Sequence, residues 1–129
     1  MSTVKINVSY LADTALDWAV AKCLGMFVRM TRGGWLDFDS DAYPEFSNTY
    51  NDDKMQSFRP SIYWHQAGPI IERERIELVP NGKGWDALQQ AQHIPIEGPT
   101  PLVAAMRCYV ASKLGDIVEV PRELYKEEN

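Results

Sequence analysis

One segment of the chain, residues 98–121, carries both the start and the stop signals of a helix. Thr100 is a residue type that caps helix N-termini, and Pro101 occupies the first helical position, where its missing N–H costs nothing. Gly115 can adopt the left-handed conformation that ends a helix. The sequence therefore predicts a helix over about residues 101–114.

The predicted helix is apolar on nearly every side, so we expect it to be central and buried. Large apolar side chains fill one wide arc, and the opposite side carries the small residues Ala104, Cys108 and Ala111. A surface helix would carry charged residues on that side. We therefore expect other elements to cover both faces, with a close approach over the small residues.

Arg107 lies in the middle of this helix. If its guanidinium is buried, it needs a carboxylate, backbone carbonyls or an anionic ligand as a partner. We expect an internal ion pair with an acidic side chain.

Length and composition indicate a single domain over residues 1–129. The net charge of −5 disfavours a nucleic-acid binder, which usually shows a basic stripe. The two cysteines, Cys23 and Cys108, form no CxxC pair and are predicted to be buried free thiols in a reducing compartment. The N-terminus lacks the apolar run of a signal peptide, and no segment has the length of a membrane span. We therefore expect a cytosolic protein that does not associate with membranes.

A second helix is predicted over about residues 14–24. Thr14 followed by Asp17 has the spacing of a capping box, and Asp13 is an alternative cap. Trp18 points away from the apolar stripe of this helix. It is either covered by a loop or part of a contact face for a ligand or partner.

Short apolar runs separated by turn residues predict strands between and beyond the helices. Alternating apolar and polar residues indicate a first strand at 4–9. Further strands are expected at 26–30, 35–38, 76–79, 85–88 and 117–120. This pattern predicts an α+β fold in which a small, mostly antiparallel sheet packs against the two helices.

Residues 37–53 contain six acidic residues and no basic one, which predicts a long acidic loop of variable sequence. Its first residues imitate a calcium-binding loop, but Ala42 and Asn48 stand where glycine and glutamate are required. We therefore expect no metal site. The charged tail, residues 122–129, is expected to fray.

No catalytic motif of the common kinds is present, and two histidines are too few for most metal centres. Cys108 lies mid-helix on a face of small residues, which favours an inert thiol. We therefore expect a non-enzymatic protein that needs no cofactor.

Two predicted helix starts could offer free N–H groups to an anion. One is Gly68-Pro69, before a short helix expected at 70–75, and the other is Thr100. Tyr63 and Trp64 could form an aromatic platform, and Arg107 could supply a cation. The candidate ligand-binding residues are therefore Tyr63, Trp64, Gly68, Thr100 and Arg107, with a candidate second contact face at Trp18. Such a pocket would suit a nucleotide-like anion. Ordinary capping and a core tryptophan explain the same features, and the sequence leaves both interpretations open.

Three segments carry a resemblance to a known family: ALDWAVAKC (15–23), PSIYWHQAGPIIERERI (60–76) and PTPLVAAMRCYVASKLGDIVEVP (99–121). They resemble the NinX-like family of small tailed-phage and prophage proteins. The resemblance implies a phage-encoded accessory protein that acts in the host bacterial cytoplasm, and it brings no catalytic residues with it. The acidic stretch at 37–53 departs most from the family pattern.

These observations support three hypotheses about function. The leading one is a phage accessory protein that binds a small anionic, nucleotide-like ligand and sequesters a host metabolite or defence signal. The alternative is a module that binds and inhibits a host protein through its acidic loop. A hydrolase or transferase acting on nucleotides is the weakest. The many apolar faces are also compatible with a homodimer.

Overall fold

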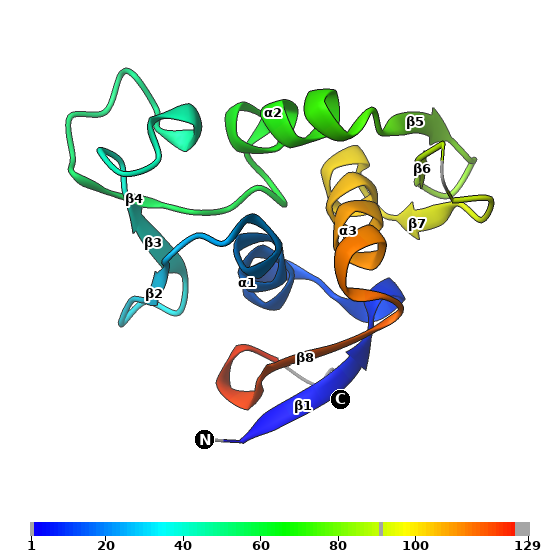
Figure 1. The fold of residues 1–129 in the computed structure, drawn as a ribbon, viewed down its shortest axis with the longest axis horizontal. Coiled ribbons are helices and arrows are strands. Elements are labelled where there is room, and N and C mark those ends of the chain that lie inside the picture. The colour runs from blue at the N-terminus through cyan, green and yellow to red at the C-terminus, as the bar shows by residue number, and fades with distance from the viewer. Residues whose placement is uncertain (1, 91, 126–129) are drawn as a thin grey trace.

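The computed structural model describes residues 2–90 and 92–125. In this part of the chain, three helices form the centre of the fold (Figure 1). They are α1 (Asp13–Leu24), α2 (Trp64–Glu74) and α3 (Pro101–Leu114). Three small antiparallel sheets lie around these helices. The predicted α+β class is therefore confirmed, with the strands divided among three sheets instead of one.

Each sheet joins strands from a different part of the chain. One pairs β1 (Thr3–Asn7) with β8 (Ile117–Pro121). The second has the order β2 (Arg29–Met30), β3 (Leu36–Asp39), β4 (Met55–Ser57). The third has the order β5 (Glu77–Pro80), β6 (Trp85–Leu88), β7 (Ile96–Gly98). Strands β5 and β6 correspond to the strands expected at 76–79 and 85–88, whereas no strand was predicted at β7.

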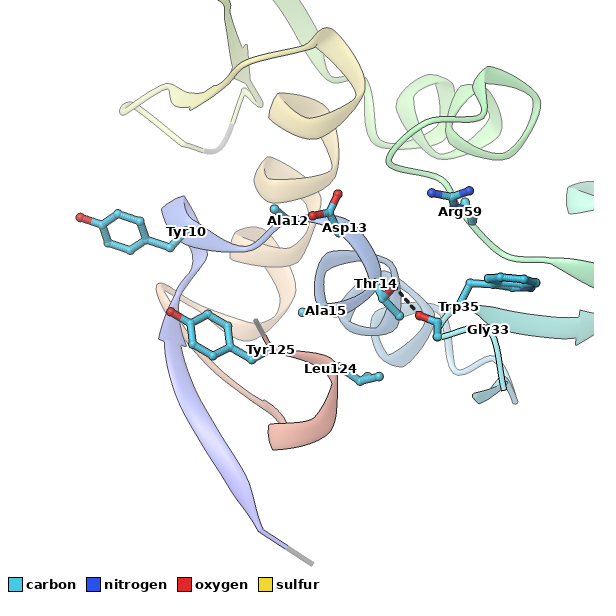
Figure 2. Close-up of a pocket in the computed structure, with 11 residues that line it drawn as sticks. Tyr10, Ala12, Asp13, Thr14, Ala15, Gly33, Trp35, Arg59, Leu124 and Tyr125 are labelled. Carbon is cyan, nitrogen blue, oxygen red and sulfur yellow. Dashed lines mark hydrogen bonds between the residues drawn. The ribbon is translucent and has the colours of Figure 1, made fainter. Parts of the chain in front are cut away.

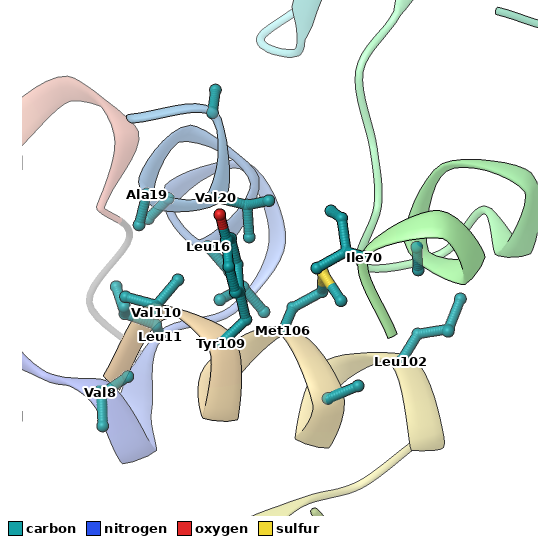
Figure 3. Packing of buried hydrophobic residues seen from close by; sticks show 14 of the residues in the cluster. Val8, Leu11, Leu16, Ala19, Val20, Ile70, Leu102, Met106, Tyr109 and Val110 are labelled. Carbon is teal, nitrogen blue, oxygen red and sulfur yellow. The ribbon is translucent and has the colours of Figure 1, made fainter. Parts of the chain in front are cut away.

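Helix α3 has the predicted bounds and the predicted Thr100 cap, whereas Gly115 combines a positive φ with a ψ of −168°, outside the left-handed helical region that was expected. The Thr100 hydroxyl oxygen accepts a hydrogen bond from the Val103 N–H at 3.2 Å, and Gly115 has a φ of 85°. Large side chains of α3, including Met106 and Tyr109, pack against α1 and α2 (Figure 3). The expectation of a central helix is confirmed, because its small-residue face is buried as well.

The small-residue face of α3 is covered by the third sheet, at the end of β7. A Cβ atom added to Gly98 would lie only 2.7 Å from the Ala104 Cα atom. Real side chains do not tolerate that separation, so glycine is required at this position. The predicted close approach over the small residues is confirmed, and Gly98 provides it.

Helix α1 begins at Asp13 and follows Ala12, which makes no side-chain capping bond. The predicted capping box is therefore wrong, because both of its side chains bond to other segments. The Thr14 hydroxyl donates to the Gly34 carbonyl at 3.0 Å, and the Asp17 carboxylate accepts from Ser61. Gly34 lies in the turn between β2 and β3, so α1 is joined to that turn instead of capping itself.

Helix α2 begins five residues before Pro69, so the prediction that Pro69 opens a short helix is wrong. A proline inside a helix removes one main-chain hydrogen bond. Gln66, which is 1% exposed, ties the first turn of α2 to the segments before it. Its Oε1 accepts the Arg59 N–H at 2.7 Å, and its Nε2 donates to the carbonyls of Ser57 at 2.8 Å and Phe46 at 3.3 Å.

Two predicted irregular segments are more ordered than expected. Asp37 and Asp39 belong to β3, and the Asp37 carboxylate pairs with Arg29 at 2.9 Å, so the acidic loop begins inside a strand. In the tail, residues 122–124 form a helical turn and Leu124 is buried. Residues 126–129 lie outside the described part of the chain.

Candidate functional site

A cavity of ≈ 620 Å³ opens where α1 begins (Figure 2). Its walls come from the segment before α1, the first turn of α1, the turn between β2 and β3, the chain before α2, and the C-terminal turn. The lining residues are Tyr10, Ala12, Asp13, Thr14, Ala15, Gly33, Gly34, Trp35, Arg59, Leu124 and Tyr125. The cavity therefore exists only when segments far apart in the sequence have come together.

The first turn of α1 brings main-chain N–H groups and one carboxylate to a wall of the cavity. No side chain of the preceding residue caps this turn, and Thr14 uses its hydroxyl to bond Gly34 instead. The first N–H groups of a helix have no partner within the helix, and the helix dipole adds positive potential there. Asp13 brings one carboxylate to the same wall, so the cavity holds both an acceptor and potential donors.

Arg59 is the one basic residue among those that line the cavity. Its backbone N–H is fixed by Gln66, and its guanidinium carbon lies 6.0 Å from the centre of the Tyr63 ring. Within residues 2–90 and 92–125, no carboxylate lies within 4.0 Å of its guanidinium group. The half-buried Arg59 thus presents hydrogen-bond donors to the cavity.

Aromatic side chains form the remaining flat surfaces. Trp35 is 44% exposed, and its ring lies against the backbone of Gly33, where a Cβ atom would collide with it. Tyr10, which is exposed, and the half-buried Tyr125 also line the cavity, on the other side of α1 from Trp35 (Figure 2). Exposed rings of this kind can stack on a planar ligand group.

Asp17 connects the cavity wall to the interior of the protein. Its carboxylate is 2% exposed and accepts hydrogen bonds from the Ser61 N–H at 2.9 Å and the Ser61 hydroxyl at 3.1 Å. Burial raises the pKa of Asp17 from 3.8 to about 7, although the Ser61 hydrogen bonds and the charge of Arg59 act in the opposite direction. The sequence signal for Asp17 was assigned to capping, so this role was missed.

The raised pKa of Asp17 predicts that the folded protein becomes less stable as the pH rises. Between pH 3.8 and about 7 the folded state retains a proton that the unfolded chain has released. The free energy of unfolding should therefore fall over this range by up to about 4 kcal/mol through this group alone. Urea unfolding at a series of pH values measures the effect.

The control for this prediction is Asp17→Asn, which keeps an oxygen for the Ser61 N–H and cannot ionise. The free energy of unfolding of wild type relative to that of Asp17→Asn should fall as the pH rises from about 4 to about 7. A difference that stays constant from acid to neutral pH would contradict the assignment.

The residues predicted from sequence to form one site lie on separate elements. Tyr63 and Trp64 are at the start of α2, Gly68 is inside α2, and Thr100 caps α3. None of these four lines the cavity at α1 or the two smaller cavities, of ≈ 540 Å³ and ≈ 210 Å³. Because α2 continues through Gly68, the helix start expected at that glycine does not exist.

Arg107 lines the smallest of the three cavities and bonds to the main chain. Its Nε donates to the Leu11 carbonyl at 2.8 Å and its Nη1 to the Glu97 carbonyl at 2.9 Å. The expected ion pair is therefore wrong, and backbone carbonyls are the partners. Burial lowers the pKa of Arg107, and the charge of Glu97 opposes that shift.

Trp18, the predicted second contact face, and the two cysteines lie outside the lining of the cavity at α1. Trp18 is half-buried at the edge of the core, with the Lys22 ammonium 5.2 Å from the centre of its ring. Cys23 and Cys108 are free, as predicted, but only Cys108 is fully buried and Cys23 is half-buried. Burial raises the pKa of each thiol to about 11. Thiols with such pKa values are poor nucleophiles at neutral pH.

Two further classes of site are not found in the described part of the chain. No three histidine, cysteine, aspartate or glutamate side chains within it come together as metal ligands. No helix there has the length and apolar character needed to cross a bilayer.

The fold and the cavity define a small α+β protein in which a mixed polar and aromatic cavity opens at the N-terminus of a buried helix. By its sequence, the chain belongs to the family described as Bacteriophage P22, NinX, whose family model matches residues 7–113. It is therefore a phage-encoded protein, and the family predicted from its three sequence segments is confirmed. No curated protein matches the chain.

Proposed function

We propose that this phage-encoded protein is a non-enzymatic binding protein for a small anionic ligand of nucleotide-like chemistry, held in the cavity at the start of α1. It would act in the cytoplasm of the host bacterium by sequestering a metabolite or defence signal. The observation that carries the proposal is Arg59, a half-buried cation without a carboxylate partner among the described residues. A half-buried cation that faces a cavity can pair with an anionic group of a ligand.

The chemistry of the lining supports a nucleotide more than a simple anion. Arg59 and the first N–H groups of α1 suit a phosphate, and the exposed Trp35 ring suits a base. Asp13 adds a carboxylate that repels a bare anion but accepts hydrogen bonds from ligand hydroxyl or amino groups. A ligand that has a phosphate, a ring and such donors uses all of these groups.

A thermal-shift screen tests the proposal, with nucleoside monophosphates, cyclic nucleotides and nicotinamide dinucleotides as probes. A ligand at about 100 times its dissociation constant adds about 2.7 kcal/mol of stability, which raises the melting temperature of a domain this size by several degrees. Arg59→Gln should weaken the binding of a positive probe by about 10- to 100-fold.

The matched control is Arg75→Gln, which removes one exposed positive charge at the end of α2, outside the cavity lining. It should leave the affinity unchanged. A panel without any stabilising probe, or equal losses in the two variants, would contradict a site at Arg59. A flat panel would favour the alternative function, binding to a host protein.

A further inference from the structure

Asp17 holds the chain segment that carries Arg59. It lies one helical turn along α1 from Asp13, which lines the cavity. Both oxygens of its carboxylate accept hydrogen bonds from Ser61, two residues after Arg59. The chain forms a tight turn from Arg59 through Ser61, because the Ile62 and Tyr63 N–H groups both donate to the Arg59 carbonyl, at 3.0 and 2.9 Å. Asp17 therefore fixes the turn that places Arg59 at the cavity.

Two charged side chains act on the Asp17 carboxylate, and both line the cavity. Asp13 on the same helix opposes ionisation of Asp17, and Arg59 on the neighbouring turn favours it. Of the other charged groups on the elements packed against α1, Glu119 of β8 accepts a hydrogen bond from the Thr3 hydroxyl, Arg107 of α3 donates to main-chain carbonyls, and Asp39 of β3 pairs with Lys54. Asp37 of β3 pairs with Arg29, and Lys113 of α3 pairs with Glu74. Because Arg59 favours the ionised form of Asp17 and lies two residues before the Ser61 that Asp17 binds, a change of charge at Arg59 should shift the pKa of Asp17.

We propose that Asp17 is a positioning residue for Arg59 and that it couples anion binding in the cavity to the uptake of one proton. This inference rests on the proposed function. A bound anion neutralises Arg59, which otherwise favours the ionised carboxylate, and adds negative charge nearby. A proton from solvent then joins a carboxylate oxygen of Asp17, and no bond to the ligand forms. By linkage, the anion binds more tightly to the protonated form of the protein.

The coupling is first measured in the full chain without any ligand, by following the ¹³C signal of the Asp17 carboxyl group through a pH titration. In the wild-type protein, Asp17 should titrate with a pKa near its expected value of about 7. Arg59→Gln and Ser61→Ala should each raise the pKa of Asp17, because each removes a group that favours its ionised form. Arg75→Gln is the control and should leave that pKa unchanged. An unchanged pKa of Asp17 in Arg59→Gln would overturn the inference.

The second measurement is the affinity for cyclic AMP, whose phosphodiester keeps a constant charge across the range studied. Calorimetry should show binding about tenfold weaker at about pH 8.5 than at about pH 6 if the anion shifts the pKa of Asp17 by about one unit. Asp17→Asn should bind cyclic AMP with the same affinity at both pH values.

The outcomes separate this inference from the proposed function. Affinity that is constant with pH in the wild-type protein, but lost in Arg59→Gln, would overturn the proton coupling and leave the binding site standing. Absence of cyclic AMP binding at both pH values would count against the proposed function and would remove the coupling to ligand with it.

Discussion

Gly98→Ala is expected to destabilise the protein by about 3 kcal/mol or more, because the added methyl group has no space against α3. The position of that methyl group would be 2.7 Å from the Ala104 Cα atom, and backbone atoms cannot move aside as a flexible side chain can. Either β7 separates from α3 or the helix shifts within a buried core. Urea unfolding should show a lower midpoint with an unchanged slope.

Gly68→Ala provides the matched control for this prediction. Gly68 lies inside α2, and a Cβ atom there meets no atom within 4 Å. Because glycine is unfavourable in a helix interior, this variant should be more stable than wild type by about 0.5 to 1 kcal/mol. A Gly98→Ala variant as stable as the wild-type protein would contradict the packing of β7 on α3.

Gln66→Leu is the second substitution with a large expected effect. Leucine has a similar size but leaves three backbone groups without the partner that Gln66 gives them, the Arg59 N–H and the carbonyls of Phe46 and Ser57. Each unsatisfied buried group costs about 1 to 3 kcal/mol, so a loss of about 3 kcal/mol or more is expected. Denaturant unfolding measures it directly.

Gln90→Leu is the control for the loss of an amide, because Gln90 is exposed. Its unfolding free energy should stay within about 0.5 kcal/mol of wild type. If Gln66→Leu were equally mild, Gln66 would not be what holds the first turn of α2 to the segments around it.

Local signals in the sequence predicted the elements that carry their own start and stop residues. Helix α3 has a threonine cap, a proline at its first position and a glycine after its last, and its bounds were correct. Strands β5 and β6 were predicted because each is a short apolar run next to turn residues. The pairing of β1 with β8 joins residues more than a hundred positions apart, and no local signal encodes it.

The errors in the helices arose where tertiary contacts outweigh local preference. Pro69 has the sequence context of a first helical residue, but α2 begins at Trp64, and Gln66 in its first turn bonds to the preceding segments. Asp17 has the spacing of a capping residue, but Ser61 offers it two donors in the interior. In both cases the partner lies in another segment, so a sequence window around the helix could not reveal it.

The candidate site could be predicted only in its chemistry. An arginine, aromatic rings and helix N–H groups were expected, but on α2 and α3, because those segments show the strongest helix-start signals. In the structure, this combination occurs at the start of α1, with Arg59 and Trp35. Gly33 and Gly34 lie in the turn before Trp35, and nothing in their local sequence indicated that this turn faces α1.

The most direct test of a ligand site at the start of α1 is a ¹H–¹⁵N NMR titration of the full chain with AMP. If the site is correct, the largest shifts should occur at the amides of Thr14, Ala15 and Gly34, and Arg59→Gln should abolish them. Shifts concentrated at the start of α3, around Val103, or no shifts at all, would contradict it.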